Sequence, residues 1–398
     1  MKKYSVWSPK SRHWSLDPAI TFLNHGSFGA CPTPILEVQR SVRSQMERSP
    51  VAFMLRELPE LWEEARARVA EFVGADAEGL VFVDNATTGV NAALRAIELS
   101  EGDVILALDH GYNACLNAAD EVAQRHGAEV RRLSLPLDDP DSGALLAQLE
   151  SALGPNVKAL LIDQITSPSA LVLPVKEICR RMSSAGVAVI VDGAHCPGQV
   201  PLELAAMGCD FFTGNLHKWV YAPKGAAILW VGPAWRERTL PTTVSHGYND
   251  QTSPAPRLHK LFDWTGTKDP SAVIAAAALE VMPNLYEGSW LELMADNHVK
   301  VTRWAADLCD GVPGIEPIGR AERWGAMVTF RLPPLEVPHS DSCVHPLQEW
   351  LWRFHRIEVP VFKGIHEEAT WLRISAQIYL GDDAHRPLID ALRELLPA

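Results

Sequence analysis

The sequence predicts an α/β fold, in which a large domain with a mostly parallel sheet is followed by a smaller α+β domain. From residue 79 onward, seven short apolar runs alternate with helix-like segments. This alternation is typical of crossover units, which build a parallel sheet covered by helices on both faces. After an Ala-rich, helix-like segment at 271–285 the alternation ends. We expect a large domain over 15–270 and a small domain over 271–398, on which residues 1–14 could pack.

The expected strands of the large domain are short runs of β-branched and other apolar residues. They lie at 80–83, 104–108, 130–135, 159–165, 187–191, 211–212 and 226–231. Helices are expected at 89–99 and 114–126, and the Pro-rich stretch 252–257 is expected to form a loop. In the small domain, 327–332 and 372–378 are strand-like and 344–354 is helix-like.

The composition excludes several function classes. The 398 residues are 47% hydrophobic and 21% charged, as in ordinary globular proteins. A net charge of −13 argues against nucleic-acid binding, which needs clustered cations. No apolar stretch is long enough to span a membrane, and the N-terminal lysines are not followed by the apolar core of a signal peptide. Seven scattered cysteines without a Cys-x-x-Cys pair are typical of reduced thiols in the cytoplasm, and they predict no metal site.

Asp192 and Lys218 are the most informative residues for function. Each lies just past an apolar, strand-like run, where ligands of such sheets bind. Alone, each would be interpreted as a turn residue or a surface lysine. Together, and with a phosphate-binding signal upstream, they suit pyridoxal 5'-phosphate (PLP). The lysine amine bonds to the aldehyde of PLP, and the carboxylate keeps the ring nitrogen protonated, so that the ring accepts electrons from the substrate.

The phosphate-binding signal is the segment 84–89, which joins a strand to a helix. It offers the amides of a helix N-terminus and the hydroxyls of Thr87 and Thr88. In isolation it would be an ordinary helix cap. After the next strand, His110 and Tyr112 present two rings, either of which could stack on the pyridine or pack in the protein.

Arg373 lies inside an apolar, strand-like run. A buried guanidinium needs a carboxylate partner, which could be structural or the α-carboxylate of a substrate.

The chain resembles the class V aminotransferase family of fold-type I PLP enzymes, and within it the isopenicillin N epimerase-like and cysteine desulfhydrase-like branch. The resemblance runs from about Leu23 to the C-terminus. It is carried by the motifs LNHGSFG (23–29), DNATTG (84–89), DHGY (109–112), DGAHCPG (192–198), NLHKW (215–219), WTGTKD (264–269) and LRISAQIY (372–379).

The resemblance implies a PLP-dependent transferase fold of type I and a role for each matching residue. Lys218 would bind PLP covalently and Asp192 would hold its ring nitrogen, while His195 would lie beside the phenolic oxygen or brace Asp192. Asn215 and His217 would join Thr87 and Thr88 at the phosphate. Tyr112 matches the stacking aromatic of this branch better than His110 does.

The remaining implied roles concern the substrate and a second subunit. The resemblance implies a homodimer with shared active sites, in which Thr267 reaches the phosphate of the neighbouring subunit. Arg373 would hold the substrate carboxylate, and Asn24 and His25 would line the substrate side. Gln164 and Ser167 occupy positions that are often His and Asn in relatives.

One departure from the family bears on the reaction. Cysteine desulfurases of this family accept sulfur on a mobile cysteine in a loop of the small domain. Here the corresponding segment, 356–371, has no cysteine, and Cys343 precedes a helix-like segment instead. A desulfurase that forms a persulfide is therefore not expected.

The expected activity is carbon–sulfur β-elimination on cysteine or a cysteine S-conjugate, because this reaction needs the fewest groups beyond Lys218 and Asp192. Epimerisation of an amino acid is the alternative, and it needs a second acid on the opposite face, for which Tyr112, His110 and His25 are candidates. Transamination is a further alternative. A PLP-fold binding protein without activity would not need Lys218, Asp192 and Arg373 together.

Overall fold

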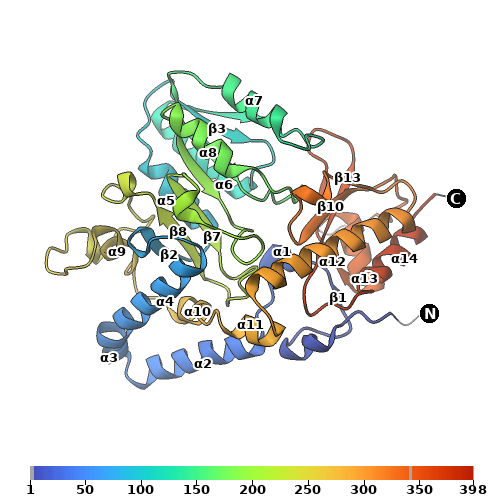
Figure 1. Ribbon diagram of the computed structural model, residues 1–398, viewed down its shortest axis with the longest axis horizontal. Helices are drawn as coiled ribbons and strands as arrows, with labels where there is room; N and C mark the ends of the chain where they lie inside the picture. The colour runs from blue at the N-terminus through green and yellow to red at the C-terminus, as the bar shows by residue number, and fades with distance from the viewer. Residues whose placement is uncertain (1–3, 340–342, 398) are drawn as a thin grey trace. The chain divides into compact units, whose positions relative to one another are not determined.

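Seven strands form the central sheet that the alternating sequence pattern predicts (Figure 1). In the computed structural model, which describes residues 4–339 and 343–397, their order is β2-β8-β7-β6-β5-β3-β4. The strands are β2 (Leu80–Val83), β3 (Val104–Leu108), β4 (Glu129–Leu133), β5 (Val157–Asp163), β6 (Ala188–Asp192), β7 (Phe211–Asn215) and β8 (Ala227–Val231). β8 is antiparallel to both neighbours, and the other neighbouring pairs are parallel. The prediction of a mostly parallel seven-stranded sheet is confirmed.

The burial of the strands follows from their sequences. All residues of β2, β3, β6, β7 and β8 are buried, as expected for apolar runs covered on both faces. β4, at one edge of the sheet, instead carries Arg131 and Arg132. Charged side chains of this kind protect an edge strand from pairing with another chain.

The segments that flank and connect the strands form helices, several of which contact strands of the sheet. They are α2 (Thr33–Arg48), α3 (Pro50–Ala52), α4 (Leu58–Phe72), α5 (Ala86–Ala96), α6 (Asn113–His126), α7 (Gly143–Ser151), α8 (Val175–Ser184), α9 (Arg257–Phe262) and α10 (Ser271–Ala276). α5 and α6 pack on each other and share one apolar cluster with Leu161 of β5 and Ile190 of β6. Because side chains alternate along a strand, the residues two positions after Leu161 and Ile190 point to the same face of the sheet as this cluster. The residue that follows each of these points to the opposite face.

The chain divides into two compact units. The large unit contains residues 34–165 and 173–279, and the small unit contains the described residues up to Thr33, residues 166–172 and those from Glu280 onward. The expected boundaries at 15 and 270 differ from this division. Residues 15–33 group with the small unit because β1 (Thr21–Phe22) pairs in parallel with β11 (Ile357–Glu358).

The small unit is built around a four-stranded antiparallel sheet of order β12-β13-β10-β9. Its strands are β9 (Glu316–Pro317), β10 (Met327–Arg331), β12 (Val361–Lys363) and β13 (Thr370–Ser375). Its helices are α1 (His25–Phe28), α11 (Val281–Tyr286), α12 (Trp290–Gly311), α13 (Pro346–His355) and α14 (Arg386–Glu394). The segment 356–371 contains β11 and β12 rather than a loop throughout.

The single long helix expected over 271–285 is instead two short helices, α10 and α11. Pro283 explains the break. Proline lacks an N–H and clashes with the preceding turn, so it is tolerated only in the first turn of a helix. α11 begins at Val281, which places Pro283 in that first turn.

Among the described residues, no helix is both long and apolar enough to cross a membrane.

Candidate active site

The carboxyl ends of the parallel strands bring most of the predicted site residues of the large unit to one edge of the sheet. Asp192 is the last residue of β6, and Asn215 is the last residue of β7. His110 and Tyr112 follow β3, and Lys218 follows β7. Because parallel strands end at the same edge, these residues lie where such sheets bind ligands.

Asp192 is buried, with 2% of its surface exposed. Its Oδ2 accepts a hydrogen bond from the Cys115 thiol (3.1 Å) and its Oδ1 accepts one from the backbone N–H of Ala194 (2.9 Å). Burial raises the pKa of Asp192, while these two donors act in the opposite direction. The protein therefore supplies hydrogen bonds that favour the charged carboxylate in a place where burial alone would neutralise it.

Asp163, which the sequence interpretation missed, lies directly beside Asp192. It ends β5 as Asp192 ends β6, and the two residues are partners in the parallel register. Asp163 is 6% exposed and accepts a hydrogen bond from the backbone N–H of Tyr112. Burial, and next the charge of Asp192, raise the pKa of Asp163 well above its usual range. The signal was present in the sequence, because Asp163 follows an apolar run just as Asp192 does.

Lys218 and His195 face each other. Nζ of Lys218 lies 3.2 Å from Nε2 of His195. The indole N–H of Trp219 donates to Nδ1 of the same imidazole at 3.4 Å, so both ring nitrogens are engaged. His195, which follows the end of β6, is thus held against Lys218.

The N-terminus of α5 is held against the end of β7. Asn215 Oδ1 accepts the backbone N–H of Ala86 at 2.8 Å. A Cβ on Gly89 would lie 2.2 Å from Oγ1 of Thr213, so only glycine permits this close approach. Asn85 caps the helix by accepting the N–H of Thr88 at 2.9 Å. The arrangement presents Thr87 and Thr88 in the first turn, where a helix attracts anions.

The side chain of His217 is in hydrogen-bond contact with the protein backbone. Its Nδ1 lies 3.1 Å from the carbonyl oxygen of Ala226, to which it can donate. Burial, followed by the charge of Lys218, lowers the pKa of His217 to about 4. At neutral pH the ring is therefore uncharged, and it could contribute a hydrogen bond rather than a positive charge to a phosphate.

The two aromatic candidates differ in exposure. His110 is buried, and its Nε2 lies 4.0 Å from an oxygen of Asp109. Tyr112 is the N-cap residue of α6 and is 47% exposed. Of the two rings, that of Tyr112 is the more accessible to a ligand.

Thr267 is exposed in the turn 264–269. This turn is tied to the large unit by two ion pairs, one from Lys268 to Asp84 (3.0 Å) and one from Asp269 to Arg43 (2.6 Å). The first of these pairs connects the turn to the residue that precedes the cap of α5.

Arg373, in β13 of the small unit, is a buried cation that lacks a carboxylate partner among the described residues. It is 2% exposed, and burial lowers its pKa to about 10. Its Nη1 donates to the carbonyl oxygen of Ser167 and lies 3.3 Å from the hydroxyl oxygen of that residue. Within the part of the chain that the structure describes, its Nε has no hydrogen-bond partner. A buried donor left in this state is costly, so the group is suited to a carboxylate ligand.

The segment that carries Asn24 and His25 packs beside Arg373 within the same unit. The backbone N–H of Gly26 donates to Oγ of Ser375 at 3.1 Å, and a Cβ on Gly26 would lie 3.3 Å from Nη2 of Arg373. Asn24 accepts a hydrogen bond from Ser27 (2.6 Å), and Nδ1 of the buried His25 lies 3.0 Å from the hydroxyl of Tyr379.

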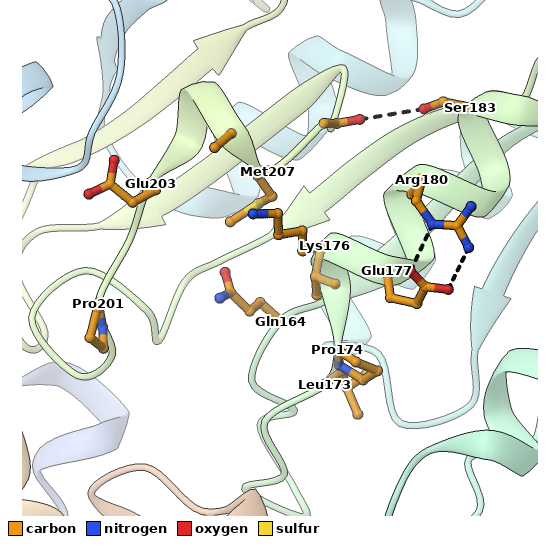
Figure 2. A pocket seen from close by; sticks show the side chains of 13 residues that line it. Gln164, Leu173, Pro174, Lys176, Glu177, Arg180, Ser183, Pro201, Glu203 and Met207 are labelled. Atoms are coloured by element: carbon orange, nitrogen blue, oxygen red, sulfur yellow. Dashed lines mark hydrogen bonds and ion pairs between the residues drawn. The ribbon is translucent and has the colours of Figure 1, made fainter.

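Gln164 does not join the carboxylates. It lines a cavity of about 890 Å³ in the large unit, together with residues of α8 and of the segment 201–208 (Figure 2). Strand alternation explains this position, because Gln164 follows Asp163 and points to the other face of the sheet. Neither Asp192 nor Lys218 lines this cavity.

The donor groups of the large unit fit PLP. A lysine amine suits the aldehyde, a buried carboxylate with two hydrogen-bond donors suits a protonated ring nitrogen, and a capped helix N-terminus with two hydroxyls suits the phosphate. Within residues 4–339 and 343–397, no cluster of three or more His, Cys, Asp or Glu side chains could hold a metal ion.

Comparison with known proteins extends over nearly the whole chain. A family model described as aminotransferase class-V matches residues 40–345. Isopenicillin N epimerase of Amycolatopsis lactamdurans is 32% identical over 408 residues, which cover 98% of this chain and 99% of that protein. An L-cysteine desulfhydrase of Arabidopsis thaliana is 27% identical over 403 residues, covering 94% and 87% of the two chains.

A solved structure shares the fold. A mutant of C-DES with glycine covalently linked to its PLP cofactor superposes with a TM-score of 0.82 at 20% identity, covering 98% of this chain and all (100%) of that one.

Proposed function

The chain belongs to the class V aminotransferase family, and from this premise we propose that it is a PLP-dependent enzyme that acts at Cα of an amino acid. Its proposed reaction is carbon–sulfur β-elimination on cysteine or a cysteine S-conjugate. Relatives named as L-cysteine desulfhydrases support this reaction. Epimerisation of the isopenicillin N epimerase type is the second candidate, because relatives with that name match at 32% and 31% identity.

PLP, when bound, takes up the substrate amine and withdraws electrons from Cα. Lys218 is proposed to attach the cofactor and then to accept the proton from Cα. His195, 3.2 Å away, holds the amine in place. Trp219 fixes the imidazole from its other side.

Asp192 is proposed to hold the ring nitrogen. Its charge is supported by the Cys115 thiol and the Ala194 amide. Thr87 and Thr88 are proposed to bind the phosphate with Asn215 and His217, and Tyr112 is proposed to stack on the ring.

Arg373 is proposed to bind the α-carboxylate of the substrate. Among the described residues, Nε of Arg373 has no hydrogen-bond partner and no carboxylate pairs with the guanidinium, which supports a planar donor pair that binds a carboxylate bidentately. Such a clamp also selects the Cα bond that stands perpendicular to the ring. Asn24 and His25 are proposed to line the substrate side, next to Arg373.

The observation that favours elimination over epimerisation is the burial of two of the three candidate second acids. His25 is buried and engaged with Tyr379, and His110 is buried beside Asp109. Of the three side chains, that of Tyr112 is exposed, whereas the imidazoles of His25 and His110 already have polar neighbours in the protein. Elimination needs no second acid, because the Cβ–S bond breaks, the sulfur leaves as a thiol, and the remaining fragment hydrolyses to pyruvate and ammonia.

The test is to incubate the enzyme with cysteine S-conjugates and with amino acids of the penicillin side-chain type. Pyruvate and thiol released in equal amounts support elimination. Inversion at Cα without pyruvate, abolished by Tyr112→Phe, supports epimerisation instead. A 2-oxo acid that keeps the substrate skeleton supports transamination. Lack of a cofactor absorbance band after reconstitution with PLP would refute the proposal as a whole.

We also propose that the enzyme is a cytoplasmic homodimer with shared active sites, in which Thr267 reaches the phosphate held by the partner subunit. The exposure of Thr267 supports its contact with a partner subunit. The free thiol state of all seven cysteines supports the cytoplasmic location.

A further inference from the structure

Two aspartates, rather than one, lie at the end of the sheet where the cofactor is proposed to bind. Asp163 and Asp192 are register partners on neighbouring parallel strands, which lie about 4.8 Å apart. Their side chains point to the same face, since Leu161 and Ile190, two residues earlier, share one apolar cluster there. Both are more than nine-tenths buried.

Two buried carboxylates this close do not both ionise readily, because each charge opposes the other in a medium that solvates neither. The groups around them decide which one keeps the proton. Asp192 accepts hydrogen bonds from the Cys115 side chain of α6 and the Ala194 amide. Asp163 accepts hydrogen bonds from two backbone amides, that of Tyr112 and its own, and its ionisation is opposed by burial and by the charge of Asp192.

The other titratable groups near the pair do not reverse this choice. Lys218, when protonated, lowers the pKa of both carboxyls. The thiols of Cys115 and Cys196 are themselves kept protonated, since burial raises the pKa of each. Asp192 therefore has the Cys115 thiol in its favour as well as a backbone donor, whereas at Asp163 burial and the neighbouring charge outweigh two backbone donors.

We propose that Asp163 is an uncharged positioning residue of the cofactor site, which carries the single proton of the Asp163–Asp192 pair. This inference rests on the proposed function, in which Asp192 meets the ring nitrogen. In its protonated form, Asp163 leaves Asp192 as the only anion of the pair. The side-chain carboxyl group of Asp163 also accepts the hydrogen bond of the Tyr112 amide. It thereby positions the turn that carries the proposed stacking ring.

The proton is measured directly by infrared difference spectroscopy on the protein as purified, at neutral pH. The wild-type minus Asp163→Asn spectrum should contain the carbonyl band of a protonated carboxylic acid. In Asp192→Asn, the band should persist but disappear at lower pH than in wild type, because the opposing charge is gone. Absence of the band from the first difference spectrum would overturn the proposal. This measurement does not require bound cofactor, so it is independent of the proposed function.

The positioning role is measured by the affinity for PLP, with a conservative and a disruptive variant. Asp163→Leu removes the acceptor of the Tyr112 amide and should weaken PLP binding about tenfold, the scale of one unsatisfied buried donor. Asp163→Asn keeps an uncharged carbonyl acceptor and should restore most of that affinity. Equal losses in both variants would mean that the charge of Asp163 matters, and would overturn the proposal. If Asp163→Leu does not fold, the Asn variant and its infrared spectrum still decide.

Discussion

Nε2 of His195 lies 3.2 Å from Nζ of Lys218, while the indole N–H of Trp219 donates to the other nitrogen of the same ring. Because the indole can only donate, Nδ1 of a neutral His195 is an acceptor and the ring proton lies on Nε2, facing the lysine. This N–H can donate to the amine nitrogen of Lys218 when that amine is uncharged, which is the form that bonds to an aldehyde or removes a proton.

Lys218→Ala should abolish covalent attachment of PLP and lower turnover by at least about a thousandfold, because it removes the amine that lies beside His195. Lys224→Ala, an exposed lysine six residues further along, is the matched control and should keep full attachment. Borohydride reduction followed by peptide mass analysis locates the modified residue. Modification of a different lysine in the wild-type protein would contradict the assignment.

Cys115→Ala should move the acid limb of the pH–rate profile to higher pH. The thiol donates to Asp192 and lowers the pKa of that carboxyl, so its removal raises this pKa and the active carboxylate is lost earlier as the pH falls. Cys115→Ser retains a donor and serves as the control, with its acid limb close to that of wild type. An acid limb that coincides in all three proteins would show that the thiol does not support the charge of Asp192.

His217 should make the fold sensitive to acid. Its pKa is lowered from 6.5 to about 4, so between these values the unfolded chain binds the proton that the folded state refuses. Stability from this group is complete above pH 6.5 and is lost as the pH falls toward 4. His217→Asn should therefore flatten the decline of the thermal midpoint over this range. His126→Asn, an exposed histidine at the end of α6, should leave the slope unchanged. Equal slopes in wild type and His217→Asn would refute the prediction.

Arg373→Lys should lower kcat/KM by a factor that corresponds to a loss of roughly 2–4 kcal/mol of transition-state stabilisation. The reason is that a lysine cannot form two parallel hydrogen bonds to a carboxylate. PLP content and thermal midpoint should change little if the residue serves the substrate. Both kcat/KM and the midpoint should be measured on the same preparation. Normal kinetics with a lowered midpoint would assign Arg373 a structural role through Ser167 instead.

A mixture of Lys218→Ala and Thr267→Glu subunits should regain part of the lost activity. If Thr267 serves the partner's site, the mixed dimer has one site with both lesions and one with neither. If Thr267 serves its own chain, where Lys268 pairs with Asp84, each site carries one lesion and activity stays low. Native mass spectrometry verifies subunit exchange, and sedimentation checks that the protein is a dimer. A monomer, or exchange without recovery, would contradict sharing.

The sequence was sufficient for the sheet because most of its strands are continuous apolar runs. Asp192 and Lys218 could be recognised because each directly follows such a run. Asp163 also follows an apolar run, but the strand expected from the sequence extends to residue 165. Asp163 therefore falls inside that expected strand rather than at its end. Pro283 divided a segment whose alanines alone suggest one helix.

Other parts of the site depend on contacts between distant residues, which a single sequence does not specify. Cys115 and Asp192 are 77 residues apart, and nothing in the local pattern of α6 shows that the thiol faces a carboxylate. The link from Arg373 to Ser167 spans 206 residues. Each contact lies within one of the two units and follows from the order of the strands and the packing inside that unit, which emerge only after the chain has folded.

The small unit gathers both ends of the chain, and this fixes an order of events during synthesis. Ser8 donates to the carbonyl oxygen of Ile378, 370 residues later, and β1 can pair only when β11 has emerged. Residues 34–279, apart from the short segment 166–172, can assemble on the ribosome beforehand. Residues 4–33 must wait until β11 and the rest of the small unit have been translated. Premature termination before β13 would leave them without their partners and expose apolar surface to chaperones and proteases.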